Sequence, residues 1–219
     1  MMKAKHQNSS RRLARRIIAV ALVGFVLLAL TGTASADHRR LIFQKEDVLG
    51  QGGAGNYQAN GALLVRLGHR VAIAWRVPTP EPGSYIYPTP DQIPPWAPPH
   101  PPVTPGRPEV FTLWAFVFNY PELCSDPCNG DDIGDTPAQG GVYQVDATIA
   151  RGKRVRMHGQ VAAGSDPVVG IPLLEPRTAE IHVAMAPHGM ALSGADLEAQ
   201  LSIPLGTPAE WWAAVFLAP

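Results

Sequence analysis

Short runs of residues that alternate between apolar and polar side chains place the strongest constraint on the fold of this 219-residue chain. In residues 179–186 (AEIHVAMA), one face of a strand would carry Ile181, Val183 and Met185, because side chains along a strand point alternately to its two faces. Residues 109–118 (EVFTLWAFVF) are apolar on both faces. This pattern indicates a central strand that is covered on both sides.

Most of the remaining sequence also has strand character. Gly and Pro turns separate the candidate strands, and the only predicted helix after residue 36 is a short one over residues 193–201 (SGADLEAQL). The other predicted strands are 62–67, 71–77, 142–150, 153–162 and the closing WWAAVFLAP, with hairpin signals at 68–70 and 151–152. Such a series predicts an all-β fold, either a β-sandwich or a barrel. We favour a single antiparallel β-sandwich, immunoglobulin-like or similar.

A proline-rich segment over residues 78–108 interrupts the series and holds 13 of the 23 prolines. Proline lacks an amide donor, so this segment cannot form a central strand. It could be a linker or a polyproline ligand for a partner. Because it also carries Tyr85, Tyr87 and Trp96, we expect an ordered excursion that packs on the domain.

The N-terminal residues predict export. A basic segment is followed by an uncharged apolar run and by Ala34-Ser35-Ala36, the three parts of a secretory signal peptide. We therefore expect a signal peptide over 1–36, cleaved after Ala36, and one domain over 37–219. The alternative is an uncleaved N-terminal anchor. No Cys follows the apolar run, which argues against a lipoprotein, so the predicted location is secreted, periplasmic or otherwise extracytoplasmic.

Charge narrows the function classes once the signal peptide is set aside. Residues 37–219 hold 12 basic and 18 acidic side chains, a formal charge of −6. A mildly acidic domain is a poor candidate for binding nucleic acid. No further segment is long and apolar enough to span a membrane. The expected partner is therefore a protein or a ligand of the cell envelope.

The stretch CSDPCNGDDIGD contains both cysteines of the chain. In an exported protein, Cys124 and Cys128 predict a disulfide, worth about 2 kcal/mol for so short a loop. A thiolate metal site completed by histidines is the alternative. The neighbouring oxygen-bearing side chains suggest a calcium loop as a further hypothesis, since calcium prefers such ligands. Its candidate ligands are Asp126, Asn129, Asp131, Asp132 and Asp135.

Three histidines are candidate ligands for a transition metal. Glu180 and His182 share one face of a predicted strand, His188 follows at its end, and His158 lies on another strand. If the two strands are close, these side chains converge into a site suited to zinc, copper or iron. The alternative is that His182 is hydrogen-bonded and half-buried and that His188 caps a turn.

Familiar catalytic motifs are absent from the sequence. There is no G-x-S-x-G elbow, H-E-x-x-H pair or P-loop. GQGGAG at 50–55 matches the G-x-G-x-x-G pattern of dinucleotide-binding sites. Such a site needs a helix directly after the glycines, whereas a strand is expected here. We read it as a glycine-rich turn.

The stretch TLWAFVFNYPELCSDPCNGDDIGD, followed by AEIHVAMAPHG, resembles a family of uncharacterised secreted bacterial proteins. The resemblance covers roughly Val110 to the C-terminus and carries no known activity. It implies a recurrent frame made of Asn119, Cys124, Cys128, Glu180, His182 and His188. Many relatives have a second cysteine pair near the C-terminus, where this chain has IPLGTPAEWWAAVF.

These observations predict an exported, non-enzymatic binding or structural module of the cell envelope or exterior. The sequence predicts no cofactor. A metal-dependent site at Glu180, His182, His188 and His158 and a calcium-stabilised loop at 126–135 are the two alternatives.

Overall fold

The computed structural model describes residues 41–98, 104–125, 127–204 and 206–219. The predicted signal peptide, residues 1–36, lies outside the described residues. Within the described ranges, no helix has the length and apolar character needed to cross a membrane.

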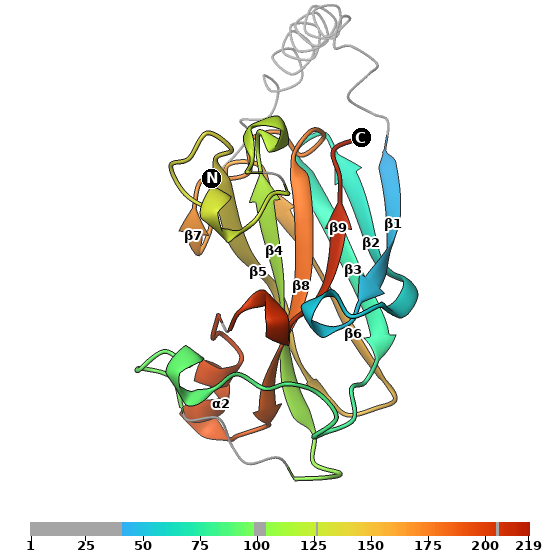
Figure 1. Cartoon of the computed structure of the whole chain (residues 1–219), viewed down its shortest axis with the longest axis vertical. Coiled ribbons are helices and arrows are strands. Elements are labelled where there is room, and N and C mark those ends of the chain that lie inside the picture. The colour runs from blue at the N-terminus through green and yellow to red at the C-terminus, as the bar shows by residue number, and fades with distance from the viewer. Residues whose placement is uncertain (1–40, 99–103, 126, 205) are drawn as a thin grey trace, which may run out of the picture. The chain divides into compact units, whose positions relative to one another are not determined.

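Among the described residues, nine strands form one curled antiparallel sheet (Figure 1). They are β1 (Ile42–Leu49), β2 (Asn56–Leu67), β3 (Arg70–Pro78), β4 (Glu109–Phe118), β5 (Gly140–Ala150), β6 (Arg154–Ala162), β7 (Val169–Gly170), β8 (Glu180–Met190) and β9 (Trp212–Phe216). Their order in the sheet is β6-β3-β2-β1-β9-β8-β4-β5-β7. The all-β prediction is confirmed. The strands form one continuous sheet, however, and not the two separate sheets of a sandwich.

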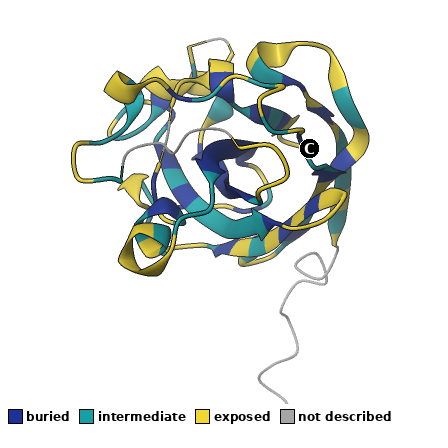
Figure 2. Cartoon of the chain, turned by 90° about the horizontal axis from the view of Figure 1, so that it is seen from below, coloured by how far each residue is buried: buried dark blue, intermediate teal, exposed yellow. Residues whose placement is uncertain are grey.

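The main core lies on the inner face of the curl. The β6-β3-β2-β1 half meets the β9-β8-β4-β5 half through a single β1–β9 residue pair, Leu49 with Ala213. Trp75 from the first half and Phe111 and Met185 from the second belong to one buried cluster. Figure 2 shows buried residues mainly on the strands toward the middle of the molecule and exposed residues mainly at its periphery. Burial of this apolar surface is the dominant favourable contribution to folding.

Several elements form where the sequence predicts them. β4 spans the residues predicted for the central strand, and nine of its ten residues are buried. The helix α2 (Gly194–Gln200) falls within the predicted 193–201, although Ser193 makes no side-chain cap hydrogen bond. Residues 51–53 form a turn that leads into β2, so the glycine-rich segment is a turn, as predicted. β1 was not predicted, because its Gln, Lys, Glu and Asp residues conceal its alternation.

The prediction of a hairpin between β5 and β6 is wrong. β6 pairs with β3 along its whole length, from Arg70–Ala162 to Pro78–Arg154, whereas β5 pairs with β4 and β7. The turn between β5 and β6 therefore connects the strand at one end of the strand order, β6, to the strand next to the other end, β5. Where these strands approach each other, a carboxylate oxygen of Asp146 accepts a hydrogen bond from the His158 amide at 2.9 Å.

The described part of the proline-rich segment packs against the domain at two places. Tyr85 contacts the main core, with its ring centroid 5.1 Å from that of Trp212. Ile93 and Ala97 pack on a second cluster, formed around Trp114 of β4. The expected anchor Trp96 does not pack in this way, since 63% of it is exposed.

A buried arginine fastens the end of the chain to the sheet. Arg66 of β2 is fully buried, and its guanidinium donates to the carbonyls of Pro176 and Ala179 at 2.9 and 2.7 Å. It also donates to the carbonyl of Leu217 and to Gln44 Oε1. Burial lowers the pKa of Arg66 to about 10, so the group remains a cation at neutral pH.

Candidate functional site

The histidines proposed as metal ligands do not converge. Nε2 of His182 lies 2.6 Å from Oε1 of Glu180 on the outer face of β8. His188 is six residues further along this strand, a rise of about 20 Å, and its Nε2 lies 2.7 Å from the hydroxyl of Thr112. His158 is exposed on β6, which four strands separate from β8 in the sheet order.

The expectation of a shared histidine site is therefore corrected. Among the described residues, no group of three or more His, Cys, Asp or Glu side chains is arranged to hold a metal ion. Alternation along a strand correctly places Glu180 and His182 together. It gives no information about which strands are neighbours, and this is where the prediction fails.

The acidic loop, residues 124–135, is held together by its own polar groups. Cys124 and Cys128 form the predicted disulfide. The carboxylate of Asp132 accepts hydrogen bonds from the backbone amides of Ser125 and Asn129, both at 2.9 Å, and from the Ser125 hydroxyl. The Ser125 amide is the main reason that the pKa of Asp132 lies below its ordinary value.

The predicted calcium ligands in this loop are otherwise engaged or turned to solvent. Asn129 Oδ1 accepts from the Asp131 amide at 2.8 Å, while the Asp131 and Asp135 side chains are exposed. Asp126 lies outside the described residues. The described part of the loop thus resembles a self-capped turn more than a cation site.

Asn119, one of the residues that the family resemblance singles out, supports the fold through hydrogen bonds to the backbone. Its Nδ2 donates to the carbonyls of Gln139 and Pro172 at 2.8 and 2.9 Å. Its Oδ1 accepts from the Leu174 amide at 2.9 Å. One buried side chain therefore ties together three chain segments, and both polar atoms of its amide group already have protein partners.

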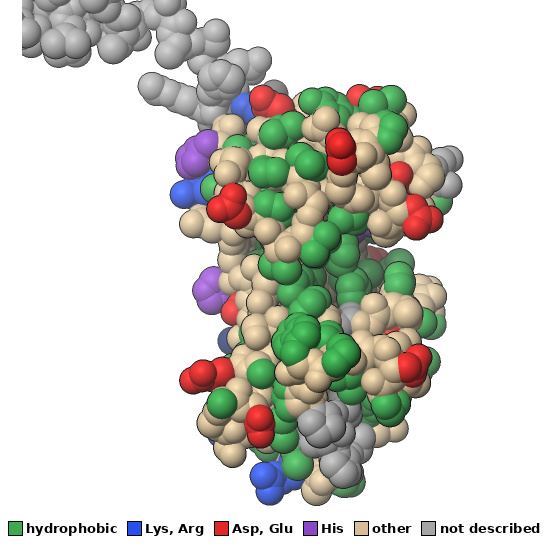
Figure 3. All heavy atoms as spheres, turned by 90° about the vertical axis from the view of Figure 1, so that its left-hand side faces the viewer, with side chains coloured by type: hydrophobic (Ala, Val, Ile, Leu, Met, Phe, Trp, Pro, Cys, Tyr) green, Lys and Arg blue, Asp and Glu red, His purple; other side chains and the backbone are tan. Residues whose placement is uncertain are grey.

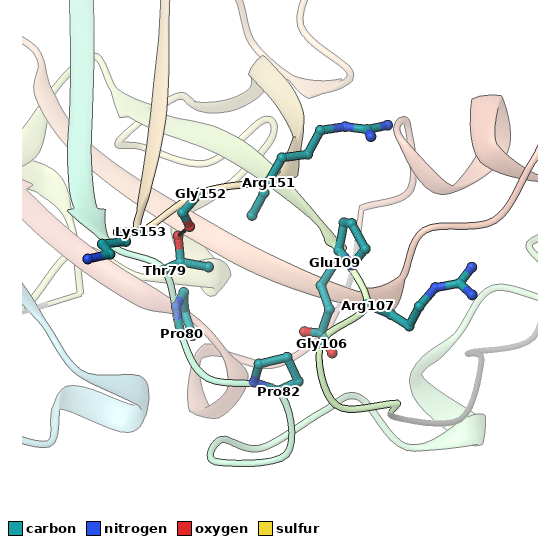
Figure 4. Close-up of a pocket in the computed structure, with 11 residues that line it drawn as sticks. Thr79, Pro80, Pro82, Gly106, Arg107, Glu109, Arg151, Gly152 and Lys153 are labelled. Atoms are coloured by element: carbon teal, nitrogen blue, oxygen red, sulfur yellow. Dashed lines mark hydrogen bonds between the residues drawn. The ribbon is translucent and has the colours of Figure 1, made fainter.

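A different part of the molecule has the character of a binding site. Two open cavities, of about 310 and 420 Å³, lie beside the turn that connects β5 to β6. The turn itself, Arg151–Lys153, lines both cavities, and Figure 4 shows the smaller one. The smaller cavity extends toward Thr79 and Pro82 after β3 and toward Gly106 before β4. We call the two cavities together the cationic cleft.

Half of the basic side chains that follow residue 36 line this cleft. All six are exposed, and none of them forms an ion pair with a carboxylate of the described chain. They are Arg76, Arg107, Arg151, Lys153, Arg154 and Arg156. The face in Figure 3, on the side of β7 and α2, contrasts with the cleft, because apolar and acidic side chains dominate there and basic ones are sparse. Basic side chains are thus concentrated at the cleft.

Two of these arginines are direct neighbours across two strands. Arg76 of β3 pairs with Arg156 of β6, and both side chains are exposed. Like charges placed opposite each other on a sheet are destabilising. Within the described residues, no carboxylate relieves this repulsion through an ion pair.

Among the described residues that line the cleft, one carries a carboxyl group. Glu109, the first residue of β4, is only 3% exposed. Its Oε1 accepts a hydrogen bond from the Tyr87 hydroxyl at 2.7 Å, and its Oε2 has no partner. Burial raises the pKa of Glu109 to about 7. Figure 4 shows its carboxyl group beside Pro82 and Gly106, with the Arg107 and Arg151 side chains extending away from it.

Sequence reasoning missed this site, although one signal was available. Residues 151–156 read RGKRVR, four basic residues in six. The other contributors, Arg76, Arg107 and Glu109, are distant in sequence, and only the strand pairing brings them to this turn.

Comparisons with models of protein families, with curated proteins and with solved structures found no match to this chain.

Proposed function

We propose that the protein is a non-enzymatic binding module of the cell envelope or exterior, and that its ligand is an anionic polymer held in the cationic cleft. The observation that carries this proposal is the set of six exposed cations without carboxylate partners around two adjoining cavities. Clefts lined by one sign of charge raise the local concentration of ligands of the opposite sign.

The neighbouring arginines on β3 and β6 support an anionic ligand. The neighbouring Arg76 and Arg156 cost stability in the free protein, and an anion placed between them would remove that cost. Arginine suits this purpose, since its planar guanidinium binds carboxylate, sulfate or phosphate oxygens through two parallel hydrogen bonds.

The arrangement of the cavities favours a polymer over a single small anion. Both cavities share the turn at Arg151–Lys153, so a chain with regularly spaced charges can occupy both sides of the turn at once. Linked contacts of this kind strengthen binding without any new type of contact. No aromatic side chain lines either cavity, and the stacking platforms typical of single-stranded nucleic-acid sites are thus missing from the described lining. An acidic polysaccharide fits these features best.

Two further observations support a non-enzymatic role and a location outside the cytoplasm. The one carboxyl group in the cleft is hydrogen-bonded to Tyr87, and no nucleophile–base pair accompanies it among the described lining residues. The disulfide and the predicted signal peptide favour an extracytoplasmic location. The metal and calcium alternatives lack comparable support, since their ligands do not gather among the described residues.

Binding of dextran sulfate, measured by isothermal titration calorimetry, tests the proposal. We expect micromolar or tighter binding to the wild-type protein, and weakening by about tenfold or more in the double variant Arg151→Ala/Lys153→Ala, which corresponds to about 1.4 kcal/mol. Raising the salt concentration should weaken binding further, because exposed charges are screened.

The control variant is Lys45→Ala, which removes an exposed cation on β1 that lines neither cavity. It should bind like the wild type. Uncharged dextran should not bind, and inorganic sulfate should bind far more weakly than the polymer. Equal binding by the double variant and the wild type would contradict the proposal, as would equal binding of charged and uncharged dextran.

A further inference from the structure

Glu109 lies where its charge state can govern the cleft. The residue is fixed by β4, which pairs it with Ala150 of β5 and Met190 of β8, and its carboxyl group lies beneath the cationic turn (Figure 4). The cations that line the cleft would attract an anion, whereas an ionised carboxylate below them would repel it.

We propose that Glu109 couples ligand binding to proton uptake, so that the cleft holds its anion tightly only while this buried carboxyl group is neutral. The inference rests on the proposed function and identifies its regulation. The proton comes from solvent and resides on Oε2, because Oε1 accepts the hydrogen bond from Tyr87.

The surroundings of Glu109 make such a proton exchange accessible near neutral pH. The charged or titratable side chains that contact it or share its cavity are Tyr87, Arg107, Arg151 and Lys153. Tyr87 donates to the carboxyl group, but no cation forms an ion pair with it. Burial dominates over these neighbours and raises the pKa of Glu109 to about 7.

Coulomb's law sets the size of the expected coupling. A carboxylate and an anionic ligand group about 7 Å apart, at an effective dielectric constant of about 30, repel each other enough to weaken binding about tenfold. Linkage works equally in the other direction, so a bound anion raises the pKa of Glu109 and the protein takes up a proton when it binds.

The experiment uses a short dextran sulfate, whose sulfate groups stay ionised between pH 5.5 and 8.5. Wild-type affinity should fall about tenfold from pH 5.5 to pH 8.5. Calorimetry at pH 7.5 in two buffers of different ionisation enthalpy should show net uptake of up to one proton. In Glu109→Gln, which keeps the shape and removes the titration, affinity should stay at the low-pH level throughout, with no proton uptake.

Two further variants separate this effect from a structural one. Tyr87→Phe removes the donor that favours the ionised form, so the midpoint of the pH profile should move to higher pH. His158→Gln replaces an exposed histidine on β6 that lines neither cavity, and it should leave the profile unchanged. A wild-type affinity independent of pH, or an unchanged pH dependence in Glu109→Gln, would overturn the inference and leave the anion site intact. Failure of dextran sulfate to bind at either pH would overturn the proposed function together with the inference.

Discussion

The two ends of the curled sheet differ in how their polar side chains are satisfied. At the end near the acidic loop, which we call the closed end, Arg66, Asn119 and Asp132 direct their polar atoms at protein groups. At the cationic cleft, exposed cations lack carboxylate partners within the described chain, and Glu109 Oε2 has none either. A polar residue whose hydrogen bonds are complete stabilises the fold, whereas an incomplete set can serve a ligand.

The largest expected difference between the two ends comes from a matched pair of arginine variants. Arg66→Ala should lower the free energy of unfolding by about 3 kcal/mol or more, because several buried carbonyls lose their donor. Arg151→Ala removes an exposed side chain and should change it by no more than about 0.5 kcal/mol. Urea denaturation measures both. Similar losses of unfolding free energy in the two variants would show that the two ends of the sheet do not differ in this way.

Asn119→Ala should have the next largest effect. The substitution leaves two carbonyls and one amide without their partner, and we expect a loss of about 2 kcal/mol in the free energy of unfolding. Dextran sulfate binding to the folded variant should be unchanged. A stable Asn119→Ala protein with impaired binding would move the functional site toward the closed end.

Glu109→Gln should stabilise the protein, and only at high pH. The folded-state pKa of about 7 lies above the ordinary value of 4.5, so wild-type stability falls as the pH rises from 4.5 through 7. The variant escapes this loss and should gain about 1–2 kcal/mol at pH 8, with little change at pH 4. Thermal denaturation at the two pH values checks this. A loss of stability at pH 8 would mean that the carboxylate is satisfied in a way that the described contacts do not include.

The smallest effect concerns the neighbouring arginines. Arg156→Glu replaces a like-charge pair with an ion pair to Arg76 and should stabilise the protein by about 0.5 kcal/mol. The same change should weaken dextran sulfate binding. Opposite signs for stability and binding would sharpen the contrast with the closed end, where a substitution such as Asn119→Ala reduces stability alone.

Sequence patterns predicted the positions of strands and helices well, but they predicted poorly which strands pair with each other. The all-apolar run of β4 and the helix α2 were found at their observed places, because local patterning specifies strand and helix. The hairpin at Arg151-Gly152 was wrongly predicted, since a turn signal shows that the chain reverses and not which strand it then joins. That choice depends on contacts between residues about 80 apart in sequence.

The candidate site could not be predicted for a related physical reason. Glu109 follows Arg107-Pro108 and has the sequence context of a surface residue, yet Tyr87 of the proline-rich segment contacts its carboxyl group. Burial of this kind arises from tertiary packing. Conversely, the clustered aspartates suggested a ligand site, whereas Asp132 is used to cap its own loop.

The pairing of β3 with β6 also has a kinetic consequence. Forming it closes a loop of about 75 residues, from Pro78 to Arg154, and pairings so distant in sequence form slowly. The cleft is complete only when β3 and β6 are paired, because that pairing places Arg76 beside Arg156. A ligand bound there must leave before the sheet opens, which slows global unfolding and protects the whole domain from proteases that attack only opened chains. Occupancy of the cleft would thereby set the lifetime of the protein.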